Sequence, residues 1–162
     1  MGGSMTESAV RLEAGNLAPK FALLDQDGNS INSEKLFDSP TIFFFFPAAG
    51  SPGCSKEAAD FQDNLKVFAE KGFKIVGISP DEPDRLKEFS RSHDLEFQLL
   101  SDPDVLVHKA FGAHGEKSLY GRIYMGVLRS TIILGAGGVI QQAMYNVKAT
   151  GHTNMLKKRL GF

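Results

Sequence analysis

The chain has 162 residues, and its 18 lysines and arginines against 19 aspartates and glutamates give a formal net charge of −1. This length is sufficient for one domain with a sizeable core, which we expect over residues 5–162. The charge shows no basic stripe that would indicate a nucleic-acid partner, and no apolar run reaches the roughly 18 residues of a membrane helix. A single cysteine excludes an internal disulfide. Without a signal-peptide pattern we expect a cytoplasmic protein, and residues 1–4 resemble a cloning scar.

The first half of the chain predicts a β-hairpin, a buried strand, a helix and a second buried strand, over residues 19–28, 41–46, 55–71 and 74–79. Gly28 provides the hairpin turn. The run Phe43–Phe46 is continuously apolar, which is typical of a central strand covered on both faces. Gly72 follows the helical spacing and is expected to end that helix.

The second half predicts a helix, a short strand, a helix, a β-hairpin and a final helix, over residues 83–93, 97–100, 105–113, 127–146 and 153–160. Gly135–Gly138 is expected to form the hairpin turn, and Thr153 or Asn154 to cap the last helix. The four histidines have no metal-ligand spacing, so we expect no metal or other cofactor. This alternation predicts an α/β fold with a central mixed β-sheet flanked by helices and an N-terminal β-hairpin.

Cys54 is the residue with the clearest chemical potential, because it lies where the strand that ends in Phe46 gives way to a helix. Unpaired backbone N–H groups and the positive end of the helix dipole favour the thiolate, the reactive form of sulfur. A buried, chemically inert cysteine is the alternative, and position alone does not decide between the two.

Three other residues are expected to surround this sulfur. Ser51 lies three residues before Cys54, and Pro47 is expected to shape the loop and shield it from water. Arg129 stands in the apolar segment 127–134, where burial is costly unless an anion meets the guanidinium. A thiolate would be that anion; the alternative is an arginine that pairs with a surface carboxylate or reaches solvent at the sheet edge.

The pattern Pro-x-x-x-Ser/Thr-x-x-Cys, here Pro47, Ser51 and Cys54, resembles the active-site signature of the peroxiredoxins. Two longer stretches, residues 51–57 and 120–131, are similar to motifs of the peroxiredoxin Q, or bacterioferritin comigratory protein, subfamily. The resemblance implies a thioredoxin-like fold and a thiol-dependent peroxidase that reduces hydrogen peroxide and organic hydroperoxides.

In such an enzyme Cys54 attacks a hydroperoxide and becomes a sulfenic acid. The Ser51 hydroxyl, the Arg129 guanidinium and the N–H groups of Gly53 and Cys54 are the expected donors to the developing charge. Gly53, Phe46 and Glu57 are grouped as candidate substrate-binding residues, although Glu57 can equally bind loop backbone, pair with Arg129 or face water. Phe111 and Tyr120 are expected to join this pocket from a mobile segment.

The chain departs from the family pattern at the resolving cysteine, because Ala59 and Ser90 stand at the two positions where members carry it. Either the enzyme naturally has one cysteine, or the resolving cysteine has been mutated. We expect thioredoxin or a low-molecular-weight thiol as the reductant and a monomer, with a homodimer as the alternative. A peroxide sensor or chaperone-like protein that uses the same cysteine is the alternative function.

Overall fold

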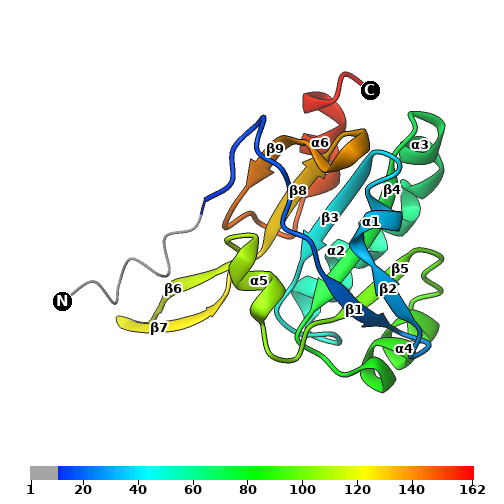
Figure 1. Ribbon diagram of the computed structural model, residues 1–162. Helices are drawn as coiled ribbons and strands as arrows, with labels where there is room; N and C mark the ends of the chain where they lie inside the picture. Colours follow the sequence, from blue (N-terminus) through cyan, green and yellow to red (C-terminus); the bar gives the residue numbers. More distant parts are fainter. Residues whose placement is uncertain (1–10) are drawn as a thin grey trace.

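The computed structural model describes residues 11–162 (Figure 1), so the suggested cloning scar at residues 1–4 lies outside the described residues. None of the helices in this part of the chain is long and apolar enough to cross a membrane.

A seven-stranded mixed sheet forms the centre of the molecule, in the order β2-β1-β5-β4-β3-β8-β9. Its strands are β1 (Ala22–Asp25), β2 (Ser30–Asn32), β3 (Thr41–Phe45), β4 (Lys74–Ser79), β5 (Gln98–Ser101), β8 (Ser130–Leu134) and β9 (Ile140–Met144). Strands β3, β4 and β5 are parallel, whereas β1, β8 and β9 run antiparallel to their neighbours. The predicted mixed sheet and N-terminal hairpin are therefore confirmed.

Helices cover both faces of this sheet (Figure 1). They are α1 (Ser33–Leu36), α2 (Pro52–Asp63), α3 (Leu65–Glu70), α4 (Pro83–Ser92), α5 (Leu106–Ala110) and α6 (His152–Arg159). Along β3, Phe44 and the following Phe46 pack with residues of α2, α3, α4 and α6, while Phe43 and Phe45 pack with residues of α1 and α5. This alternation follows from the two-residue period of a strand and explains why every residue of β3 is apolar or buried.

The predicted helix over residues 55–71 is wrong in extent, because the chain forms α2 and α3 with Asn64 between them. The Asn64 side-chain amide donates to the Asp60 carbonyl at 2.8 Å, so it competes with the helical backbone pattern. The start of α2 is three residues earlier than predicted, because Pro52 suits the first helical turn. Cys54 therefore lies inside the first turn of α2, where the helix N-terminus can favour its thiolate.

The segment before Val127 holds a hairpin that the sequence analysis did not predict, formed by β6 (His114–Leu119) and β7 (Arg122–Val127). It projects from the main sheet beside α5 (Figure 1). Its two-residue turn has Tyr120 and Gly121 at φ 51° and 78°. Tyrosine is not among the residues that normally signal such a turn, which is why the turn went unrecognised.

The remaining differences concern element ends. The last helix begins at His152 after Gly151, so the predicted cap by Thr153 or Asn154 is wrong. The helix predicted over residues 105–113 is shorter, because it covers only Leu106–Ala110. The glycine-rich hairpin turn between β8 and β9 is confirmed and contains a short 3-10 turn, η2 (Ala136–Gly138).

Candidate active site

The loop that follows β3 is held in place by backbone hydrogen bonds and by residues after β4. Phe46 N–H donates to the Ile78 carbonyl at 3.0 Å, so the chain remains beside β4 for one residue beyond β3. Asp81 accepts a 2.7 Å hydrogen bond from the N–H of Ala49, and Arg85 donates to the carbonyl of Ala49 at 3.4 Å. These contacts from both sides position residues 47–51 ahead of α2.

Cys54 is the third residue of α2, which begins at Pro52 and has Ser51 as its N-cap. The first backbone hydrogen bond of this helix runs from Ser55 N–H to the Ser51 carbonyl at 2.9 Å. The N–H groups of Gly53 and Cys54 precede that bond and belong to the unpaired donors of a helix N-terminus. The thiol therefore sits where the backbone carries partial positive charge.

Arg129 lies in the two-residue link between β7 and β8, so its predicted position within a continuous strand is wrong. The strand is interrupted at two backbone hydrogen bonds: the N–H of Leu128 donates to the Ala113 carbonyl at 2.9 Å, and the carbonyl of Arg129 accepts from the N–H of Val147 at 2.8 Å. Both bonds fix the backbone that carries the guanidinium.

The Arg129 guanidinium connects Cys54 and Glu57, two residues that are one turn apart on α2. Its Nη2 lies 3.4 Å from the sulfur of Cys54, and its Nη1 donates to Glu57 Oε1 at 2.6 Å. A Cβ on Gly53 would lie 3.3 Å from Nη2, a tight contact, so the absence of a side chain there lets the guanidinium approach the helix. Of the alternatives left open for Glu57, the structure shows pairing with Arg129.

Burial and charge have opposite effects on the pKa values of Glu57 and Arg129. Glu57 has no exposed side-chain surface, and its Oε2 has no hydrogen-bond partner among residues 11–162. Burial raises the pKa of Glu57 to about 7, although Arg129 acts in the opposite direction. For Arg129 burial alone would lower the pKa, but the charges of Glu57 and then Cys54 outweigh it and raise the pKa.

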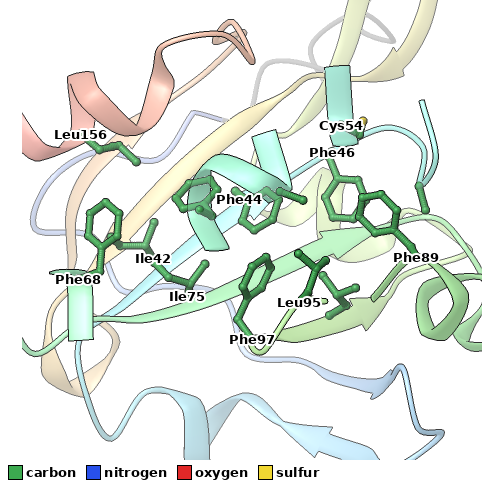
Figure 2. Close-up of a cluster of buried hydrophobic side chains, with 14 of the residues drawn as sticks. Ile42, Phe44, Phe46, Cys54, Phe68, Ile75, Phe89, Leu95, Phe97 and Leu156 are labelled. Carbon is green, nitrogen blue, oxygen red and sulfur yellow. The ribbon is translucent and has the colours of Figure 1, made fainter. Parts of the chain in front are cut away.

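The sulfur is enclosed: Cys54 is 0% exposed, whereas the Arg129 side chain retains 16% exposure. Figure 2 shows Cys54 beside Phe46 and Phe89 at one end of the buried cluster, with Phe68 and Leu156 at the other. Phe46 is also fully buried and belongs to the same cluster as Cys54, and its contact with substrate remains a prediction. Arg129 thus contacts the enclosed sulfur while part of its own side chain is exposed to solvent.

The remaining predicted residues lie around the loop and on two helices. Pro47 is half-buried, and the Ser51 hydroxyl donates to the Ala48 carbonyl at 3.0 Å rather than to sulfur. Ala59 lies on α2, and Ser90 on α4 donates its hydroxyl to the Leu95 carbonyl at 3.2 Å. The roles assigned to these four residues remain predictions.

Two further residues are not where we expected them. Phe111 packs with Phe43 and Phe45 on the opposite face of the sheet from Cys54. Tyr120 is 95% exposed at the turn between β6 and β7. The suggestion that both complete the pocket is wrong, because Phe111 lies on the other face of the sheet and Tyr120 belongs to a hairpin that turns away from the sheet (Figure 1).

The sequence analysis missed a buried contact beside the site, between the imidazole Nε2 of His152 and the hydroxyl of Thr131, at 2.6 Å. These residues are 21 positions apart and belong to α6 and β8, so no local spacing signals the contact.

A thiol in the first turn of a helix and a guanidinium within reach of its sulfur together define the site of a thiol-dependent peroxidase.

Comparison with known proteins supports this class. A model of the AhpC/TSA family matches residues 14–143. A putative peroxiredoxin of Mycobacterium tuberculosis is 48% identical over 151 residues, which cover 93% of this chain and 96% of the relative. Peroxiredoxin Bcp of Escherichia coli is 37% identical over 145 residues, covering 90% and 93%. The chain belongs to the AhpC/TSA family.

Solved structures of similar proteins have the same fold as this chain, in addition to similar sequences. Peroxidoxin BcpB from Mycobacterium tuberculosis superimposes with a TM-score of 0.81 at 31% identity, covering 93% of this chain and 97% of that one. The bacterioferritin comigratory protein of Xanthomonas campestris, described for alkyl peroxide reduction, gives 0.81 at 30% identity, covering 87% and 90%. The thioredoxin-like peroxiredoxin fold and its assignment to the peroxiredoxin Q group are therefore confirmed.

Proposed function

We propose that this peroxiredoxin reduces hydrogen peroxide and organic hydroperoxides through the thiolate of Cys54. The observation that carries the proposal is the 3.4 Å distance between Arg129 Nη2 and the Cys54 sulfur. A guanidinium cannot lose its charge in a protein, so it is a constant source of positive potential beside the nucleophile. Alkyl peroxide reduction by the similar Xanthomonas protein supports the substrate class.

The reaction transfers one oxygen and two electrons. The Cys54 thiolate attacks the terminal oxygen of ROOH, an S–O bond forms, and the O–O bond breaks. Sulfur loses two electrons and becomes a sulfenic acid, while the leaving RO⁻ takes a proton and departs as water or an alcohol. Negative charge is therefore spread over sulfur and both oxygens in the transition state.

Arg129 is placed to stabilise that charge. Its Nη2 faces the sulfur, and part of its side chain remains exposed to solvent. The N–H groups of Gly53 and Cys54 provide further donors at the start of α2. Glu57 holds the other edge of the guanidinium through Nη1, which restricts rotation of the arginine.

Regeneration of the thiol requires a reductant from outside the chain, because the sequence has one cysteine. A thiol R′SH condenses with the sulfenic acid to give a mixed disulfide and water, and a second thiol restores Cys54. We propose thioredoxin, a related redoxin or a low-molecular-weight thiol as this reductant, and a cytoplasmic monomer as the working form.

Turnover with a panel of reductants tests this function. The wild-type protein and Cys54→Ser would each be mixed with hydrogen peroxide and with thioredoxin plus its reductase, a glutaredoxin system or a small thiol. We expect continuous peroxide loss with at least one reductant, and none above background for Cys54→Ser, which should retain the wild-type circular dichroism spectrum.

Two results would contradict the proposal. Equal peroxide loss in the Cys54→Ser variant would remove the thiol from the chemistry. A single oxidation without turnover under every reductant would favour the peroxide sensor over the peroxidase.

A further inference from the structure

His152, the first residue of α6, is 2% exposed and lies against β8. Its Nε2 shares a 2.6 Å hydrogen bond with the Thr131 hydroxyl, while its Nδ1 has no partner within residues 11–162. Burial lowers the pKa of His152 to about 4, and the positive charges of Arg129 and Arg159 act in the same direction. The ring is therefore neutral at neutral pH, when the site is expected to work.

Thr131 lies two residues after Arg129, and Ile133, two residues further along β8, packs in the same cluster as Cys54, so Thr131 is on the face of the sheet that carries Cys54. The segment that contains them is tied twice to the loop between β9 and α6. Val147 N–H donates to the Arg129 carbonyl at 2.8 Å, and His152 binds Thr131 at the other end of the loop. Residues 147–152 are thus held at one end to the backbone of Arg129 and at the other end to the side chain of Thr131, two residues further along the chain.

The middle of this loop reaches the start of α2. The Cβ of Ala149 is 3.8 Å from the position that a Cβ on Gly53 would occupy, and Arg129 Nη2 is 3.3 Å from that same position. The loop and the guanidinium therefore meet over one residue, directly before Cys54. A shift of the loop would change the surroundings of both the sulfur and the arginine.

We propose that His152 and Thr131 are positioning residues of the peroxidase reaction, whose hydrogen bond holds the loop of residues 147–152 against the site and keeps Arg129 aligned with the Cys54 sulfur. This inference rests on the proposed function, since it concerns the same reaction. Long side chains such as arginine require support from neighbouring contacts to hold a catalytic geometry. A displacement of about 1 Å can cost up to about 10²-fold in rate.

The test replaces Thr131 by valine, which has a similar shape but no hydroxyl. We expect the second-order rate of Cys54 oxidation by hydrogen peroxide to fall roughly tenfold in Thr131→Val, because Arg129 is less well aligned. Alkylation of Cys54 by iodoacetamide, which does not break an O–O bond, should not fall in parallel. Thr131→Ser keeps the hydroxyl and should restore most of the oxidation rate.

Thr41→Val is the matched control for lost stability. Thr41 is fully buried at the far end of β3, where its hydroxyl donates to the carbonyls of Leu36 and Ser39 at 3.1 and 2.9 Å. This variant should also lower the melting temperature but leave the peroxide rate unchanged. His152→Phe, which keeps a flat ring against Phe61 without the hydrogen bond, should match Thr131→Val in rate.

The slower oxidation of Cys54 in Thr131→Val must also depend on Arg129. In an Arg129→Met background, Thr131→Val should cause little further slowing, because there is no guanidinium left to align. A wild-type rate in Thr131→Val, or equal slowing in both backgrounds, would overturn the positioning role. Failure of the wild-type protein to consume peroxide through Cys54 would instead overturn the proposed function, so the two failures are distinguishable.

Discussion

The buried carboxylates of Glu57 and Asp102 lie on opposite sides of the sheet and differ in how completely they are paired. Asp102 pairs with His108 at 2.6 Å, and Oδ2 also accepts the His108 N–H at 2.8 Å. Its Oδ1 accepts the N–H of Val107 at 3.3 Å, so both oxygens are satisfied. Glu57 has one strong partner, Arg129, and one oxygen without any in the described chain.

The two pKa values move in opposite directions as a result. Burial by itself would raise the pKa of Asp102, but hydrogen bonds and charge from His108 outweigh burial and lower it. For Glu57 burial dominates, and the pKa rises to about 7 in spite of Arg129. A carboxylate that holds the fold is fully paired, whereas the one next to the nucleophile is left incompletely paired, a pattern associated with functional sites.

The partners differ as well. His108 is enclosed on the α5 side of the sheet, where its ring packs edge-on against Phe45 at 5.0 Å. Arg129 extends from its carboxylate to the Cys54 sulfur and keeps part of its surface exposed. We therefore expect changes at the Glu57–Arg129 pair to alter chemistry, and changes at the Asp102–His108 pair to alter stability alone.

The largest expected effect is that of Arg129→Met. Loss of a donor aimed at developing charge typically costs about 10²–10³ in rate, so oxidation of Cys54 by hydrogen peroxide should slow by that order. Stopped-flow measurement of the single-turnover reaction gives this rate directly. The double variant Arg129→Met with Glu57→Gln is the control, since it avoids an unpaired buried carboxylate and should be equally slow. A rate within about twofold of wild type would contradict the account.

Asp102→Asn should have the second-largest effect, on the free energy of unfolding. Hydrogen bonds to a charged group contribute about 1.5–3 kcal/mol, and we expect a loss of this order in urea unfolding at neutral pH. Because the pKa of Asp102 is lowered in the folded state, its contribution is present above the unfolded pKa and is lost as pH falls through the folded value. The variant should therefore differ least from wild type in acid. Slower peroxide reduction in Asp102→Asn would break the comparison.

Glu57→Gln should have the most gradual effect, which appears as a change in the pH dependence of stability. The folded pKa of Glu57 is raised to about 7, so its contribution is present below the unfolded pKa and is lost as pH rises towards 7. Within this window the wild type should lose about 1 kcal/mol of stability per pH unit relative to Glu57→Gln. Unfolding curves at several pH values would measure the difference. Parallel curves for the two proteins would show that Glu57 does not titrate there.

Much of the fold follows from local pattern. The strand Lys74–Ser79 and the buried run before Pro47 were predicted because each is a short apolar segment, which is typical of a strand covered on both faces. The hairpin β6–β7 was not predicted, because its strands are exposed and lack strong alternation. The break at Asn64 coincides with a hydrogen bond from its side chain to the Asp60 carbonyl, which helical periodicity does not reveal.

In the site, too, single residues could be predicted from local sequence, whereas contacts between distant residues could not. Cys54 was identified from its place between a strand and a helix, and Arg129 from the cost of a cation in an apolar segment. Cys54 and Arg129 are 75 positions apart in the sequence, and Glu57 and Arg129 are 72 apart. No local pattern indicates either contact. His152 and Thr131 were missed entirely, because only packing of α6 on β8 brings them together.

The most direct test of the central claim is the product formed by one equivalent of hydrogen peroxide on the reduced protein. Mass spectrometry, with dimedone to trap sulfenic acid, would locate the added oxygen. We predict a single oxygen on Cys54, formed rapidly in wild type and far more slowly in Arg129→Met. An unmodified Cys54 with oxygen on methionine instead, or equal rates in the two proteins, would contradict the claim that Arg129 activates this sulfur towards peroxide.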